Sequence, residues 1–188
     1  MGYKFKIAPF LLGITAIMLS ACAEPPKTIS IYDGLSDSDS SKFQNIVSQF
    51  IIEHGFGDHV IYLSGDSNGA NQALLDGKVD IVNSLGQPSI VADGKQIKKV
   101  GDYFISKNLI DSAPKIVAFL TKMHIAEEIV TECLQWAEDE GTDFDGAALY
   151  FLINNQSKWS TWLEDAQYQA AKKIMSEQIA KSDLKDKF

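Results

Sequence analysis

Short apolar runs alternate with helically spaced apolar positions through the first half of the chain. Runs rich in β-branched and other apolar residues at 28–32, 59–63 and 79–85 predict three buried strands. The stretches between these runs carry helical patterns, so the predicted order is strand–helix–strand–helix–strand. That order favours a parallel sheet, because parallel neighbours need a crossover connection, which a helix supplies.

Two helices are predicted between these strands. The longer one has apolar residues at offsets of 0, 3, 4, 7 and 8, which share one face: Phe43, Ile46, Val47, Phe50 and Ile51. It follows the polar stretch 33–41, which supplies its cap, and it is expected to end at His54 and Gly55. The shorter helix covers 70–75 and stops at Gly77.

The second half of the chain is expected to be helical. Residues 89–108 show no clear period, whereas helical spacing continues from Ser112 onward, with Ser112 as a cap and Pro114 in a first turn. Gly141 terminates one helix, and a long last helix begins near Trp159. We therefore expect an α/β fold: a small parallel sheet of about three strands flanked by helices, with a helical C-terminal half.

The start of the chain has the order of a bacterial export signal: two lysines, an apolar run and then small residues. The apolar run is short and has no stop-transfer flank, so a cleaved signal is favoured over a spanning helix. It ends in Leu19-Ser20-Ala21-Cys22, which resembles a bacterial lipobox, in which the cysteine is lipidated. A plain signal peptide with an incidental cysteine is the alternative. We expect a signal peptide over 1–21, a tether over 22–27 and a single domain over 28–188.

The expected location is the extracytoplasmic face of the membrane, in the cell envelope, with Cys22 as the lipid anchor. Without residues 1–21 the chain has 15 lysines against 25 acidic residues, a net charge of about −10. This charge repels phosphates, so no nucleic-acid partner is expected. It gives no polybasic help at the membrane, so the lipid would act alone. Arginine is absent, so an anion site would need lysine or backbone N–H groups.

Two blocks resemble the substrate-binding proteins of glycine betaine/choline ABC transporters. The first, GDSNGANQALLDGKVDI at 65–81, has the form of the family's ligand-facing loop, short helix and following strand. The second runs from SAPKIVAFL at 112–120 through QWAEDEG at 135–141 to WSTWL at 159–163, as in the family's C-terminal helices. The resemblance implies a type II periplasmic-binding-protein fold, a small zwitterionic or quaternary-ammonium solute, and an ABC permease as partner.

Two departures qualify the resemblance. Family members have two lobes that close on the ligand, and only about twenty residues, 89–108, stand where the second lobe belongs, which is too few for a core. The chain therefore resembles one lobe with the other missing. In the family a tryptophan after the third strand often forms one wall of the ligand box. The matching place here is Leu85-Gly86, which has no aromatic ring.

The ligand-binding candidates stand at the ends of the predicted strands, because ligands of open α/β sheets bind at the carboxyl ends of the strands. They are Asp33, Gly34, Ser67, Asn68, Gly69, Leu85 and Gly86. The free N–H groups of a helix that opens at 67–69 suit a carboxylate or a phosphate. An ordinary capped turn is the alternative interpretation of 67–69.

The remaining chemistry-bearing residues are expected to be structural. Three tryptophans stand at core spacing on helix faces, which favours the core over a ligand cage: Trp136, Trp159 and Trp162. Three histidines lack ligand spacing, so no metal site is expected: His54, His59 and His124. Cys133 is expected to be a buried, inert thiol. No nucleophile–base–orienter set is visible, so we expect neither an enzyme nor a cofactor.

The sequence therefore predicts a lipid-anchored solute-binding component of an ABC transporter, which captures its ligand non-covalently and delivers it to a permease. The alternative is a membrane-anchored interaction or regulatory protein on a one-lobe scaffold that no longer binds solute. In that case an exposed apolar patch is expected where the second lobe would dock. Its candidate members are Leu85, Ile90, Val91, Tyr103 and Phe104.

Overall fold

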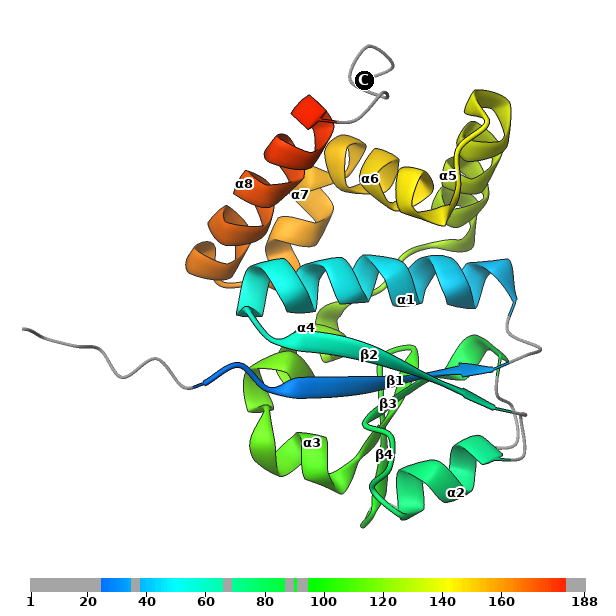
Figure 1. Ribbon diagram of the computed structural model, residues 1–188, viewed down its shortest axis with the longest axis vertical. Helices are drawn as coiled ribbons and strands as arrows, with labels where there is room; N and C mark the ends of the chain where they lie inside the picture. The colour runs from blue at the N-terminus through cyan, green and yellow to red at the C-terminus, as the bar shows by residue number, and fades with distance from the viewer. Residues whose placement is uncertain (1–24, 35–37, 66–68, 87–89, 91–94, 182–188) are drawn as a thin grey trace, which may run out of the picture.

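Five strands form one mixed sheet at the centre of the molecule (Figure 1). Their order across the sheet is β2-β1-β3-β5-β4, so the expected α/β class is confirmed. The strands are β1 (Thr28–Gly34), β2 (His59–Gly65), β3 (Ile81–Asn83), β4 (Ile97–Val100) and β5 (Tyr103–Ser106). The computed structural model describes residues 25–34, 38–65, 69–86, 90 and 95–181.

The three predicted strands are the parallel part of the sheet. Ile31 of β1 pairs with Tyr62 of β2 on one side and with Ile81 of β3 on the other. Paired residues point to the same face, so Tyr62 lies on the face that carries Ile31. Strand β3 is shorter than the run at 79–85 because the chain turns into a 3-10 helix, η2 (Ser84–Gly86).

The antiparallel half of the sheet has no counterpart in the sequence prediction. Strands β4 and β5 form a hairpin turned by Gly101 (φ +52°), and β5 pairs antiparallel with β3. The sheet therefore has five strands where about three were expected. Within β4, Lys98 and Lys99 are exposed between buried Ile97 and Val100, so neither face shows the alternation by which a strand is recognised.

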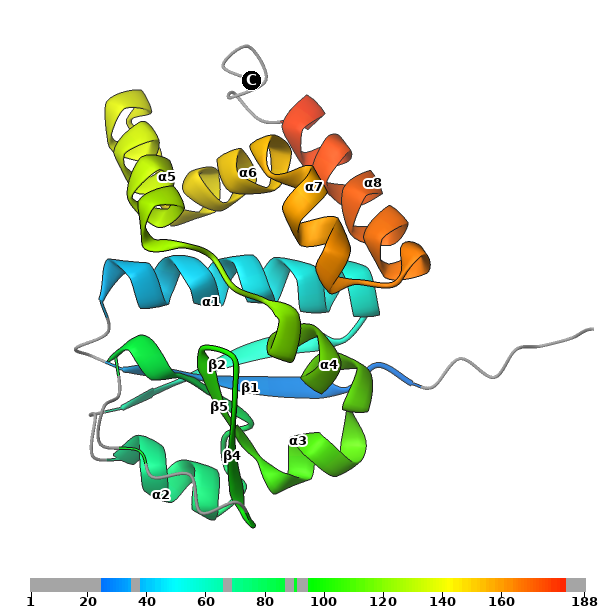
Figure 2. The same ribbon diagram turned by 180° about the vertical axis from the view of Figure 1, so that it is seen from behind.

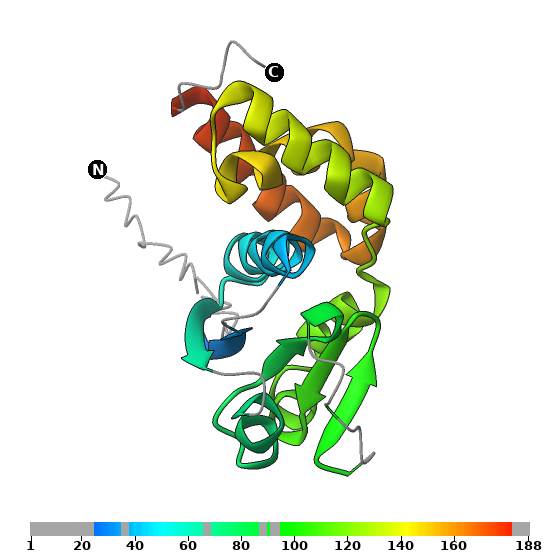
Figure 3. The same cartoon turned by 90° about the vertical axis from the view of Figure 1, so that its right-hand side faces the viewer.

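Helices cover both faces of the sheet (Figures 1 and 2). On one face α1 lies against the sheet, and α5–α8 stack on its outer side, so α1 is enclosed between two layers (Figure 3). On the other face lie α2 and α3 (Figure 1). The helices are α1 (Asp39–Ile51), α2 (Gly69–Leu75), α3 (Lys107–Ser112), α4 (Pro114–Lys122), α5 (Glu127–Glu140), α6 (Phe144–Asn154), α7 (Gln156–Trp159) and α8 (Asp165–Lys181).

The enclosed position of α1 matches its sequence, which buries two sides. Apolar side chains face α6, and the rings of Phe43 and Phe151 meet edge to face with centroids 6.0 Å apart. Each such buried side chain contributes about 2 kcal/mol. The sheet side of α1 is polar instead, with four buried residues: Ser41, Gln44, Asn45 and Ser48. Ser38 caps the helix by accepting the N–H of Ser41 (3.2 Å).

The end of α1 differs from the prediction. The chain continues past His54 as a π-helix, η1 (Ile52–Phe56), and ends at Gly57, whose φ of +78° a side chain would oppose. Gly55 serves close packing instead, since a Cβ there would lie 3.3 Å from the carbonyl oxygen of Gln167 on α8. From the sequence alone, a glycine that allows a neighbouring helix to approach closely cannot be distinguished from a glycine that ends its own helix.

The C-terminal helices are confirmed as a group, with two local differences. Ser106 caps α3 by accepting the N–H of Leu109 (3.2 Å), whereas Ser112 ends that helix and Pro114 opens the next one. The long last helix is broken: α7 and the 3-10 helix η3 (Ser160–Trp162) precede α8. Gly141 does end α5, with φ of +66°. Of the helices in the described ranges, none combines the length and the apolar content needed to cross a bilayer.

Candidate functional site

The carboxyl ends of β1, β2 and β3 meet at one edge of the sheet, on the right in Figure 1. Asp33 and Gly34 at the end of β1 pair in register with Ser64 and Gly65 at the end of β2. The N-terminal ends of α1 and α2 follow these strands, and η2 follows β3 and packs against α1. We call this edge the rim. It is the place at which the sequence predicted a ligand.

The structure brings the described candidates to the rim. Asp33 is half-buried and Gly34 is buried at the end of β1. Gly69 opens α2, and Gly86 ends η2. The side chain of Leu85 is 46% exposed. Ser67, Asn68 and the predicted lipidation site Cys22 lie outside the described residues. A ligand-binding role for any of these residues stays a prediction.

A buried polar layer lies between α1 and the sheet beneath the rim. Asn83 at the end of β3 donates from Nδ2 to Oε1 of Gln44 (3.3 Å), and the hydroxyl of Tyr103 donates to the backbone oxygen of Gln44 (3.4 Å). Asn45 is 1% exposed, and neither Oδ1 nor Nδ2 of its side chain has a hydrogen-bond partner among the described residues. Burying an amide without hydrogen bonds costs free energy, so Asn45 is a destabilising element of this layer.

Gly65 is a glycine for a steric reason. A Cβ at this position would overlap the hydroxyl oxygen of Tyr32, whose ring is buried beneath the other face of the sheet. Packing against Tyr32 therefore explains the glycine at position 65, the first residue of the block 65–81 that resembles the binding-protein family.

Tyr62 is an exposed aromatic residue beside the rim that the sequence analysis missed. Its side chain is 37% exposed on edge strand β2, on the face that carries α1. Burial raises the pKa of its phenol above the ordinary value, and the carboxylates of Asp33, Glu53 and Asp145 raise it further. In the described part of the chain none of these three carboxylates forms an ion pair. An aromatic face with the Asp33 carboxylate two positions along the same face of the sheet is a favourable environment for an organic cation.

The tryptophans lie elsewhere and are structural. Trp159 and Trp162 are buried, and Trp159 Nε1 donates to the backbone oxygen of Leu152 (2.7 Å). Trp136 stacks on Tyr150 with ring centroids 4.5 Å apart on the helical layer. Trp159 and Trp162 therefore have the core role that their spacing favoured, whereas Trp136 is partly buried.

The apolar patch expected for the alternative function was placed wrongly. Ile90, Tyr103 and Phe104 are at most 7% exposed; Tyr103 and Phe104 are buried because β5 is an inner strand whose two faces are covered. Leu85 is exposed as expected, and Val91 lies outside the described residues. Among the described residues, the exposed large apolar side chains are instead those of Ile61, Tyr62, Leu63, Leu75 and Leu85.

The histidines make separate local contacts. His54 packs on Phe50, His59 is exposed on β2, and His124 Nδ1 lies 3.0 Å from a carboxylate oxygen of Asp102. Over the described ranges no three His, Cys, Asp or Glu side chains come together as a metal-ligand set.

Comparison with known proteins bears on the fold. No known family profile matches the chain, and no curated protein is found as a relative. Among solved structures, an ABC-transporter choline binding protein in complex with choline matches with a TM-score of 0.58 and 9% sequence identity. The match covers 79% of this chain and 98% of that chain. The fold is similar to that of a periplasmic binding protein domain.

Proposed function

We propose that this protein is the solute-binding subunit of an ABC transporter, anchored by lipid at Cys22 on the extracytoplasmic face of the membrane. Its ligand is a small zwitterion or quaternary-ammonium solute, held non-covalently at the rim and passed to a permease. The observation that carries the proposal is the rim itself: the carboxyl ends of three parallel strands and the N-terminal end of α1 meet at one edge, with Tyr62 and the Asp33 carboxylate on one face of the neighbouring strands.

The fold supports this proposal by analogy. The choline binding protein named above shares the fold, and choline is a quaternary ammonium compound. Such a cation has no hydrogen-bond donor on its nitrogen, so it is recognised by aromatic faces and negative charge. Tyr62 and Asp33 offer these two features side by side, since they lie two positions apart on the same face of β1 and β2.

A single lobe limits the expected affinity. Two-lobed binding proteins close around a ligand by a hinge motion, and one lobe leaves the ligand half exposed. We therefore expect dissociation constants on the order of 0.1–1 mM for the best solute.

Calorimetric titration of the protein from residue 23 onward with choline, glycine betaine and carnitine tests the capture step. 3,3-Dimethylbutanol, which has the shape of choline without its charge, is the matched control and should bind at least tenfold more weakly, because the carboxylates would gain nothing from it. Dissociation constants well above the millimolar range for all three solutes would contradict the proposal.

The anchor is tested separately in the full chain. Metabolic labelling with palmitate should modify the wild-type protein and leave Cys22→Ser unlabelled, and the variant should leave the membrane fraction. Labelling that persists in Cys22→Ser would place the lipid elsewhere.

A second candidate function is a membrane-anchored interaction protein that has lost solute binding. The exposed edge strand β2 favours it, because Ile61, Tyr62 and Leu63 present apolar side chains along an edge that no other strand of the described residues pairs with. Light scattering of the wild type and of Leu63→Lys separates the two functions. Self-association that Leu63→Lys abolishes, together with no solute binding, would support this candidate.

A further inference from the structure

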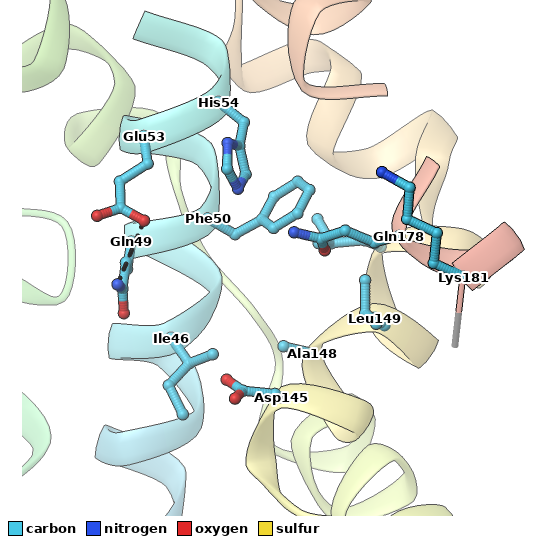
Figure 4. Close-up of a pocket in the computed structure, with 11 residues that line it drawn as sticks. Ile46, Gln49, Phe50, Glu53, His54, Asp145, Ala148, Leu149, Gln178 and Lys181 are labelled. Carbon is cyan, nitrogen blue, oxygen red and sulfur yellow. Dashed lines mark hydrogen bonds between the residues drawn. The ribbon is translucent and has the colours of Figure 1, made fainter. Parts of the chain in front are cut away.

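A pocket of about 460 Å³ lies between α1, α6 and α8 (Figure 4). That volume is within the range of small-molecule sites. Phe50 and Ile46 reach into it from the side of α1 that faces α6, whereas the buried polar residues of α1 face the sheet. The pocket therefore lies on the side of α1 turned away from the sheet, whereas the rim lies at the carboxyl ends of the strands. Glu53 and Asp145 line the pocket and also raise the pKa of Tyr62, but the solute site proposed above is at Tyr62 and Asp33.

The middle of the pocket is apolar. The ring of Phe50 meets the imidazole of His54 edge to face, with centroids 4.6 Å apart. Ala148, Leu149 and Leu152 of α6 line the opposite wall. Burial lowers the pKa of His54 below 6.5, although Glu53 opposes the shift, so the imidazole is neutral at physiological pH.

Opposite charges stand at the two ends of this apolar middle. In Figure 4 the Asp145 carboxylate lies at one end beside Ile46, and Lys181 lies toward the other, with Phe50 and Gln178 between them. Neither charge has an ion-pair partner among the described residues. Burial and the neighbouring Asp143 raise the pKa of Asp145, as expected for a carboxylate without a compensating cation.

The sequence builds this arrangement with one face of α8. Gly55 lets α8 approach η1 at Gln167. Gln178 and Lys181 follow three and four turns later at spacings that keep them on the same face. The contact that fixes α8 against the end of α1 therefore also aims Gln178 and Lys181 at the pocket.

We propose that this pocket binds a small zwitterion with a short methylene spacer, whose ammonium group pairs with Asp145 and whose carboxylate pairs with Lys181. Phe50 and Leu149 contact the spacer, and Gln178 supplies an amide beside it. A fatty acid would leave Asp145 unpaired, and a simple amine would leave Lys181 unpaired, so the two charges together select a molecule that carries both.

The test is a titration of the isotope-labelled protein with ω-amino acids of increasing length, from 4-aminobutanoate to 8-aminooctanoate, followed by NMR. The amide signals of Ala148 and Leu149 and the side-chain signal of Gln178 should shift and saturate, and one chain length should bind best. Hexanoate and hexylamine, each with one of the two charges, should bind about tenfold more weakly than the best ω-amino acid.

Charge variants test the assignment of the two ends. Asp145→Asn and Lys181→Gln should each weaken binding about three- to tenfold, because both charges are partly solvated. Glu177→Gln and Lys173→Gln, on the exposed side of α8, are matched controls and should leave binding unchanged. The double swap Asp145→Lys with Lys181→Asp should restore binding of the same zwitterion in the reverse orientation.

Absence of any saturable shift at these signals up to about 10 mM ligand, a concentration that corresponds to negligible affinity, would overturn the proposal. Binding that is the same for hexanoate, or that Asp145→Asn and Lys181→Gln leave unchanged, would also overturn it, since the charges would then select nothing. Shifts confined to Gly34 and Gly69 would place the ligand at the rim and likewise count against the pocket.

Discussion

Glu53 ties the end of the first long helix to the open edge of the sheet: its Oε1 accepts a hydrogen bond from the backbone N–H of Val60 in β2 (3.1 Å). Gln49, one turn earlier, donates to the other carboxylate oxygen (3.3 Å). Among the strands of the described residues, β2 has no neighbour on its outer side, so its outward N–H groups are open to pairing with another chain. Glu53 occupies one of them.

Replacing Glu53 by alanine should therefore destabilise the protein by about 1 kcal/mol and promote association through β2. Glu53→Gln keeps an acceptor oxygen and should retain most of the stability. Urea denaturation and light scattering measure the two effects. If Glu53→Ala and Glu53→Gln behave alike, the hydrogen bond to Val60 is not what matters at this position.

Asp80 joins three strands and is expected to be a stability determinant. Its Oδ2 accepts the N–H of Ser30 in β1 (2.9 Å) and the Ser30 hydroxyl (2.8 Å), while its backbone oxygen accepts the N–H of Ser106 at the end of β5 (2.9 Å). Asp80→Ala leaves the Ser30 N–H without its acceptor and should cost about 2–3 kcal/mol.

A double-mutant cycle with Ser30→Ala separates the two parts of this contact. The hydroxyl is lost in Ser30→Ala and the N–H stays, so the coupling energy between the two positions should be about 1 kcal/mol. Additive effects of the two substitutions, within experimental error, would show that the side-chain bond contributes nothing.

Cys133 should be unreactive in the native protein. Burial raises the pKa of its thiol to about 12, and Glu132 adds to the shift, so at pH 8 only about one thiol in 10⁴ is ionised. Iodoacetamide should leave Cys133 unmodified in native protein from residue 23 onward and modify it in urea. Mass spectrometry reads the result, and rapid native labelling would contradict the buried position in α5.

His54 should make the protein less stable in mild acid. Its pKa is lowered by burial in the folded state, so as the pH falls through 6.5 the unfolded chain takes up the proton first. The free energy of unfolding should therefore decrease below about pH 6.5 and level off below the folded-state pKa.

The comparison is between wild type and His54→Asn, unfolded in urea at about pH 7.5 and about pH 5.5. The loss of stability between these two pH values should be smaller in the variant by a few tenths of a kcal/mol, because the side chain is partly exposed. An equal loss in both proteins would assign the acid sensitivity to other groups.

Tyr62 should contribute to solute binding through its ring. Tyr62→Ala is expected to weaken choline binding about three- to fivefold, which corresponds to an exposed cation–π contact, whereas Tyr62→Phe keeps the ring and should bind almost normally. Calorimetry measures both. Equal weakening in the two variants would point to the hydroxyl instead of the ring.

Much of the fold could be predicted from the sequence because it depends on local patterns. The offsets of Phe43, Val47 and Phe50 place α1, and the apolar run at 28–32 places β1, since each pattern reflects one face of one element. Gly77 and Gly141 end their helices as predicted, with positive φ values. These features depend on neighbours within a turn or two.

The parts that could not be predicted depend on contacts between distant segments. The β4–β5 hairpin is short, and each face of β4 has one buried and one exposed residue. The sequence therefore shows no alternation of apolar and polar residues that would predict this strand. Tyr103 and Phe104 look like members of an exposed patch in the sequence, but β5 lies inside the sheet and their side chains are buried in the cores on its two faces. The role of Gly55 also depends on a distant contact, because it is the close approach of the Gln167 backbone that requires a glycine there.

The sequence by itself determined the α/β class, the three parallel strands and the rim as the place to expect a ligand, because hydrophobic period and chain order fix which elements form and where their ends meet. Only the tertiary structure decided that β2 is an edge strand, that Tyr62 joins Asp33 beside the rim, and that Asp145 and Lys181 face one pocket. These relationships arise when burial brings together side chains that are far apart along the chain, and no local pattern records which partners they will meet.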